Sequence, residues 1–184
     1  MALVASQIKL NNGDIAPDFS LKGIDGKTHI LADYSDYEGL LVVFMCNHCP
    51  YVKMKIEALK SLYEEFKDKI AIIGINSNDP EYLGEGMENM QTFTKERGIE
   101  FPYLLDNSQA VARTYGAVCT PDPFLFNKER KLFFHGKINN MMKEGDMATE
   151  NTMKDNISRM LKGEKLEKWF DPSLGCSIKW KQPL

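Results

Sequence analysis

The chain has 184 residues, of which 43% are hydrophobic and 27% are charged, and this is the length and composition of one globular domain with its own core. The formal net charge of -3 argues against a non-specific binder of nucleic acid or of acidic membranes. The first residues lack the pattern of a signal peptide, and no apolar run is long enough to span a membrane. We therefore expect a cytoplasmic protein in which four cysteines serve chemistry or packing and do not form a disulfide scaffold.

The first half of the chain alternates strand and helix patterns. Residues 16–31 alternate apolar and polar positions around a central Asp-Gly, which predicts a β-hairpin. Residues 39–45 are continuously apolar, as in a central strand that is covered on both faces. From Pro50 to about Phe66, apolar residues recur every three or four positions and predict an amphipathic helix. A second buried strand is expected within residues 69–79.

The second half continues this alternation and then changes. The expected elements are a helix ended by Gly98, a strand at 101–106, a short helix at 108–116, two strands at 123–127 and 131–137, and a helix from about 150 to 161. The last two strands are too close for a parallel crossover, so they predict an antiparallel hairpin. The whole pattern predicts one α/β domain with a core at about 13–162. The tail, 163–184, is expected to wrap the surface, anchored by Trp169, Phe170 and Trp180.

Two cysteines lie between the first buried strand and the following helix, within the sequence VVFMCNHCPYV at residues 42–52. Backbone N–H groups and the helix dipole stabilise a thiolate at a helix N-terminus and lower its pKa. Cys46 and Cys49 are therefore a candidate redox pair, in which one sulfur attacks a disulfide and the other resolves the mixed disulfide. His48 either stabilises the thiolate or is a solvated loop residue.

A metal site is the alternative use of this pair. A structural zinc site needs a second pair of ligands, and Cys119 and Cys176 stand alone in the sequence. A metal-delivery protein for copper or zinc could instead combine the pair with the distant His135. We favour redox chemistry, and we expect no metal or other cofactor, because Cys-x-x-Cys beside a strand–helix–strand pattern is typical of redox proteins.

Several segments together resemble the thioredoxin-like superfamily of the AhpC/TSA, or redoxin, type. They are residues 16–31, the Cys-Asn-His-Cys-Pro motif, residues 101–126 and residues 131–138. More narrowly, the chain is similar to cytoplasmic thioredoxin-like proteins that are often called peroxiredoxin-like. The resemblance covers residues 13–162 and part of 172–180. It implies a three-layer α/β/α sandwich with a mixed central sheet and an N-terminal β-hairpin extension.

The resemblance also implies roles for individual residues. Cys46 and Cys49 form the redox pair, the Thr120–Pro121 peptide bond is cis, and its loop lies against the pair and offers the Thr120 backbone to an incoming peptide. Cys119 then lies near the site, either as an extra resolving thiol or as a packed residue. Cys176, in the tail, is either a resolving thiol or buried.

The choice of the attacking sulfur stays open at this point. The thioredoxin pattern favours Cys46, because the first cysteine of such a motif is usually the more exposed one with the lower pKa. Pro50 favours Cys49, since proline fits the first helical position and peroxiredoxins often carry a proline after their reactive cysteine. We expect Cys46 to attack.

Two features depart from the family pattern. Met45 stands where thioredoxins have tryptophan, and residues 39–45 contain no acid to handle the proton of the second thiol, so His48, water or Asp122 must do so. The peroxiredoxin motif Pro-x-x-x-Thr-x-x-Cys is absent before both cysteines. The sequence therefore predicts a thiol-disulfide oxidoreductase that acts on protein or small-molecule disulfides and is reduced by a cellular dithiol. The alternatives are an antioxidant thiol peroxidase and a metal-binding protein.

Overall fold

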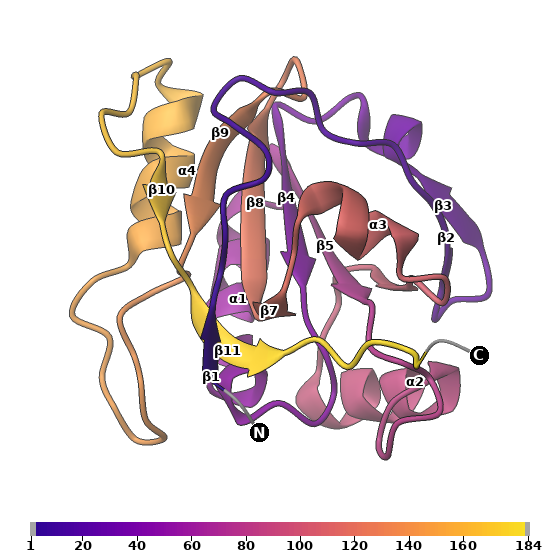
Figure 1. Cartoon of the computed structure of the whole chain (residues 1–184). Coiled ribbons are helices and arrows are strands. Elements are labelled where there is room, and N and C mark those ends of the chain that lie inside the picture. The colour runs from indigo at the N-terminus through magenta and orange to yellow at the C-terminus, as the bar shows by residue number, and fades with distance from the viewer. Residues whose placement is uncertain (1–2, 183–184) are drawn as a thin grey trace.

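The computed structural model describes residues 3–182, and its centre is an eight-stranded mixed sheet (Figure 1). The strand order is β10-β9-β8-β4-β5-β6-β2-β3. The strands are β1 Leu3–Ala5, β2 Ser20–Gly23, β3 Thr28–Ile30, β4 Gly39–Phe44, β5 Ile70–Asn76, β6 Tyr103–Leu105, β7 Cys119–Thr120, β8 Asp122–Asn127, β9 Leu132–Gly136, β10 Phe170–Asp171 and β11 Leu174–Ser177. The helices are a 3-10 turn at Leu31–Tyr34, α1 Pro50–Phe66, α2 Met87–Arg97, α3 Ala110–Tyr115 and α4 Thr152–Leu161.

The predicted three layers are confirmed by the packing on the two faces of β4. Leu41 and Val43 point to one face, where they pack in a core with buried residues of α1, α2 and α4. Val42 and Phe44 point to the other face and pack in a second core with α3 and the N-terminal segment. Every residue of β4 is buried, because helices cover both faces of the sheet (Figure 1).

The sheet is mixed, as predicted. β4 pairs in parallel with β5 and antiparallel with β8, which continues into the antiparallel hairpin with β9. The hairpin β2–β3 extends the opposite edge by pairing antiparallel with β6. Within residues 3–182 no helix combines the length and the apolar character needed to cross a bilayer.

Helix α1 begins as the sequence predicts. Cys49 has an extended backbone and occupies the N-cap, and Pro50 takes the first helical position, where its missing N–H costs nothing. The predicted apolar stripe is buried, including Val52, Ile56 and Leu59. This stripe fixes α1 against the sheet, so the two cysteines stay at the carboxyl end of β4.

In the C-terminal tail, Trp169 and Trp180 pack against a core cluster as predicted, but the tail also forms strands that the sequence did not predict. β10 pairs in parallel with β9, and β11 lies between β1 and β7 in a separate three-stranded sheet. In Figure 1 the tail runs from β10 into β11, which lies beside β7. Trp169, Phe170 and Trp180 are half-buried, whereas Cys176 is buried. The tail is thus part of the β structure that surrounds the cysteines, and its backbone pairing holds it there.

Candidate active site

The two motif cysteines meet in a buried turn between β4 and α1. Cys46 follows β4 after one residue, and Cys49 forms the N-cap of α1. Both are 0% exposed, and the four cysteines of the chain are all present as thiols. The expectation that Cys46 is the more exposed sulfur is therefore wrong.

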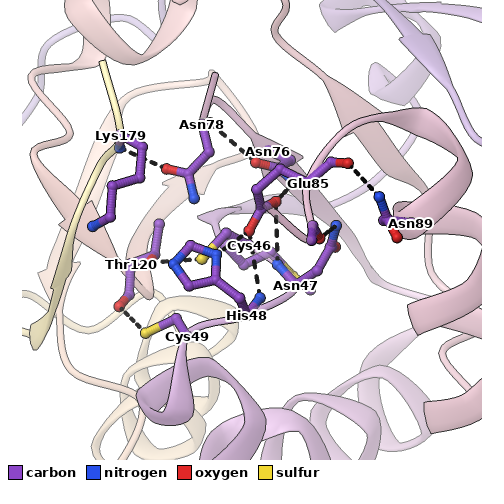
Figure 2. A network of polar contacts seen from close by, with 12 residues as sticks. Cys46, Asn47, His48, Cys49, Asn76, Asn78, Glu85, Asn89, Thr120 and Lys179 are labelled. Atoms are coloured by element: carbon purple, nitrogen blue, oxygen red, sulfur yellow. Dashed lines mark hydrogen bonds and ion pairs between the residues drawn. The ribbon is translucent and has the colours of Figure 1, made fainter. Parts of the chain in front are cut away.

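The Thr120–Pro121 peptide bond is cis, as the family resemblance implies, and Thr120 contacts both cysteines (Figure 2). The Cys46 Sγ lies 3.2 Å from the Thr120 side-chain hydroxyl. The Cys49 thiol donates a hydrogen bond to the Thr120 carbonyl oxygen over 3.2 Å. The predicted contact between this loop and the cysteine pair is therefore present in the structure.

A buried carboxylate that we did not predict anchors the turn between the cysteines. Glu85 is 2% exposed and contacts the ring Nδ1 of His48. The Asn76 side chain donates a hydrogen bond to Glu85 over 2.6 Å, and the backbone N–H groups of Asn47 and His48 point to its two oxygens (Figure 2). Because these donors belong to the turn itself, Glu85 fixes the conformation of the turn.

Glu85 also carries negative charge beside Cys46. Burial raises the pKa of Glu85, but hydrogen bonds from His48 and Asn76 outweigh burial, so the net pKa is lowered. A ring nitrogen of His48, a carboxylate oxygen of Glu85 and the Cys46 Sγ all lie within 4.8 Å of one another. His48 is therefore within reach of Cys46, and a negative charge stands behind it.

The environments of the two sulfurs separate their pKa values. A hydrogen bond to Cys49, burial and the charge of Glu85 raise the pKa of Cys46 well above its ordinary value. The pKa of Cys49 is lowered to about 5, first by the hydrogen bond from the Cys46 thiol and, against the opposing effect of burial, by hydrogen bonds from Cys176 and the Val52 N–H of α1. This direction is opposite to the expectation that Cys46 has the lower pKa, and its largest cause is the hydrogen bond between the two sulfurs.

The other two cysteines lie next to the pair. Thr120 in β7 is opposite Cys176 in β11, and the thiol and the backbone N–H of Cys176 both bond to Cys49. Cys119 is opposite Ser177, and burial raises the pKa of its thiol. Both cysteines are buried, and only for Cys176 does the structure give a direct bond to the pair among the described residues.

The predicted roles of Asp122 and His135 in the site are not supported. The His135 Nε2 lies 2.7 Å from an Asp122 oxygen, both side chains are fully buried, and the imidazole stacks on Phe124. Among the described residues, the cluster that could hold a metal consists of Cys46, His48 and Glu85, so the predicted metal set that uses His135 is not formed. Cysteine, histidine and carboxylate are ligands that zinc accepts, but here the histidine and the carboxylate already bind each other.

These features define a class of protein. A mixed α/β/α sandwich with a Cys-x-x-Cys turn before a helix and a cis-proline loop against it is a thioredoxin-like fold. Residues 12–135 match the AhpC/TSA family, and the chain belongs to this family.

Known structures and proteins agree with this assignment. A crystal structure of a conserved protein from Geobacillus kaustophilus has a TM-score of 0.93 and 34% sequence identity, and the match covers 100% of this chain and 99% of that one. A hypothetical protein from Sinorhizobium meliloti 1021 has a TM-score of 0.91 and 36% identity, over 97% of this chain and 98% of that one. The thiol-disulfide oxidoreductase ResA of Geobacillus thermodenitrificans is 29% identical over 121 residues, which are 65% of this chain and 66% of that protein. That name is consistent with the predicted oxidoreductase.

Proposed function

We propose that the protein is a thiol-disulfide oxidoreductase in which Cys49 attacks the substrate disulfide and Cys46 resolves the mixed disulfide. The observation that carries this proposal is the position of Cys49. Cys49 occupies the N-cap of α1, and the hydrogen bond from the Cys46 thiol lowers its pKa to about 5. Ionisation of Cys49 at neutral pH therefore gives up its hydrogen bond to the Thr120 carbonyl oxygen and keeps the one from Cys46. The thiolate is the reactive form in thiol-disulfide exchange.

The reaction takes two exchange steps. The Cys49 thiolate forms a bond to one sulfur of the substrate, and the other substrate sulfur leaves as a thiolate. Cys46 then loses its proton and attacks the Cys49 sulfur, which releases the second substrate thiolate and leaves a Cys46–Cys49 disulfide. The two electrons pass from the cysteine pair to the substrate. A cellular dithiol would return the protein to its reduced form.

The His48–Glu85 pair is suited to accept the proton of Cys46 in the second step. A ring nitrogen of His48 lies within 4.8 Å of the Cys46 sulfur, and Nδ1 of the ring contacts Glu85. A carboxylate in this position orients the imidazole for proton transfer. His48 thus takes the task that the sequence alone left between His48, water and Asp122.

The test uses one equivalent of a small aromatic disulfide whose thiolate absorbs visible light. The wild type should release two thiolates per protein and form an intramolecular disulfide. Cys49→Ser should lower the rate of the first release at least about a hundredfold, which corresponds to about 2.7 kcal/mol of barrier. Cys46→Ser should keep the first release. If Cys46→Ser loses the first thiolate release and Cys49→Ser retains it, Cys46 is the attacking sulfur.

A second candidate reaction is the reduction of peroxides. The observation that favours it is a match to peroxiredoxin Q of Populus jackii, with 27% identity over 109 residues. The Cys49 thiolate would attack one peroxide oxygen and become a sulfenic acid, while the O–O bond breaks and the other oxygen leaves as water or an alcohol. Cys46 would then attack the Cys49 sulfur and displace water to form the disulfide. Hydrogen peroxide releases no coloured thiolate, so its reaction is followed by the loss of free thiols from the reduced protein, which distinguishes the two reactions. Oxidation by peroxide that is faster than exchange with the disulfide would favour the peroxidase.

A further inference from the structure

The C-terminal strand β11 occupies the edge of β7 at the cis-proline loop. Cys176 is opposite Thr120 in antiparallel register, and Thr120 is the residue whose backbone the family resemblance offers to an incoming peptide. Gly175 makes this close pairing possible, because a Cβ at that position would lie 2.0 Å from the Thr120 carbonyl oxygen. The strand β11 therefore lies beside Thr120, at the position where the family resemblance implies that the backbone of a substrate binds.

The sulfur of this strand lies at the reactive cysteine. Cys176 is 2% exposed, and both its thiol and its backbone N–H bond to Cys49. Cys49 therefore receives hydrogen bonds from two thiols, Cys46 in the motif and Cys176 in the tail. A thiol within hydrogen-bonding distance of a sulfur is already near the position from which it can attack that sulfur as a disulfide.

We propose that Cys176 is a second resolving thiol, which attacks the Cys49 sulfur of the mixed disulfide and forms a Cys49–Cys176 disulfide. This inference rests on the proposed function, because the substrate disulfide is the oxidant. The bond between Cys49 and the substrate breaks, the bond between Cys49 and Cys176 forms, and the substrate sulfur leaves with the two electrons of the broken bond. The proton of Cys176 passes to the departing thiolate, so atoms and charge balance.

Cys119 is the other buried cysteine near the pair, but its position in β7 differs from that of Cys176 in β11. Cys119 precedes Thr120 in β7 and is paired with Ser177, whereas Cys176 is opposite Thr120 itself. Successive side chains in a strand point to opposite faces, so the side chains of Cys119 and Thr120 point away from each other. Thr120 contacts both motif cysteines, and Cys176, opposite it, shares their side of the strand pair.

The test compares two variants that each retain Cys49 and one other cysteine. Cys46→Ser/Cys119→Ser retains Cys176, and Cys46→Ser/Cys176→Ser retains Cys119. Each reduced protein receives one equivalent of the small aromatic disulfide. The variant with Cys176 should release two thiolates per reagent at a rate that does not depend on protein concentration, and peptide mapping should identify a Cys49–Cys176 bond. The variant that retains Cys119 should release one thiolate per reagent and remain a mixed disulfide.

The outcomes distinguish this inference from the proposed function. If both variants release one thiolate and stop, Cys49 attacks as proposed but Cys176 does not resolve, and this inference is wrong. If neither variant releases a thiolate, attack by Cys49 fails and both proposals fall. Acid-quenched mapping of the oxidised wild type is an independent measurement that needs no substitution. A Cys49–Cys176 fraction there supports the inference, and its complete absence overturns it.

Discussion

The surroundings of Cys46 and of Cys49 differ, although the two residues share one motif and are equally buried. Cys46 faces the polar network of Glu85 and His48, so a negative charge lies beside its sulfur. Cys49 faces the start of α1 and the strand β11, which supply hydrogen-bond donors to its sulfur, and its thiol donates to the Thr120 carbonyl oxygen. Burial is common to both, so the difference in pKa comes from neighbouring charge and hydrogen bonds and not from exposure.

In the proposed function, one turn holds a thiol and a thiolate side by side. The carboxylate of Glu85 holds the turn through backbone N–H groups and also disfavours ionisation of Cys46. The proton is therefore kept on Cys46, and its thiol donates to Cys49. The negative charge of Glu85 beside Cys46 thus helps Cys49 to ionise.

Removal of Glu85 should have the largest effect on stability. Glu85→Ala leaves the buried donors of Asn76, Asn47 and His48 without an acceptor, and should lower the free energy of unfolding by about 3 kcal/mol. Urea denaturation measures this loss. Glu81→Ala is the matched control, because Glu81 lies in the same loop with an exposed side chain and should change stability by less than about 0.5 kcal/mol. Equal losses in the two variants would show that Glu85 does not anchor the turn.

A substitution in β11 should change the surroundings of Cys49 and leave those of Cys46 unchanged. Gly175→Ala places a Cβ 2.0 Å from the Thr120 carbonyl oxygen, so β11 must move away from β7. We expect a loss of about 1–3 kcal/mol in stability. In a Cys46→Ser background, formation of the Cys49–Cys176 disulfide should slow about tenfold, which corresponds to about 1.4 kcal/mol of barrier. The same thiolate-release assay and urea denaturation give the two values.

Leu174→Ala is the control for that substitution. Leu174 lies in the same strand and is 39% exposed, so its truncation leaves the backbone pairing of β11 intact. Its rate of disulfide formation should stay within about twofold of the parent, because surface substitutions change energies by less than about 0.5 kcal/mol. If Gly175→Ala is as fast as Leu174→Ala, the close approach of β11 does not position Cys176.

Local patterns in the sequence predicted most of the fold. The apolar run at 39–45 became the fully buried strand β4, and Gly98 ends α2 with the left-handed backbone (φ 60°) expected of a glycine stop. The hairpin at 16–31 pairs as predicted. These elements depend on periodicity and on turn residues a few positions apart, which one sequence contains in full. The strands of the tail were missed because β10 and β11 are short and their partners are distant in the chain.

The active site was only partly predictable for the same reason. The motif and its resemblance led to Cys46, Cys49 and the cis Thr120–Pro121 bond. Glu85 was missed because it lies 38 residues from Asn47 in a loop without periodicity. One signal was present: glycines with positive φ flank Glu85 on both sides, as in a segment where the backbone turns tightly. Without Glu85, the sequence could not show the negative charge beside Cys46, and the identity of the attacking sulfur stays a prediction.

The smallest effect should come from removing the hydrogen bond between the two thiols. Cys46→Ala deletes the first cause of the low pKa of Cys49 but retains the helix N-terminus and Cys176, so the pKa of Cys49 should rise from about 5 by about one unit, equivalent to about 1.4 kcal/mol. Ultraviolet thiolate absorbance of the reduced protein measures this change. Cys46→Ser keeps a hydroxyl donor at the same position and should shift the titration less.

The sign of the accompanying stability change follows from the same shift. Between about pH 5 and the ordinary cysteine value of about 8.5, Cys49 is ionised in the folded protein and protonated in the unfolded chain. Unfolding then takes up a proton, so the stability of the reduced wild type should rise with pH across this window and should be lost as pH falls through about 5. Urea midpoints measured along the window should rise less steeply for Cys46→Ala. Cys49→Ser should lack the rise, and a rise that survives this substitution would assign the ionised sulfur to another cysteine.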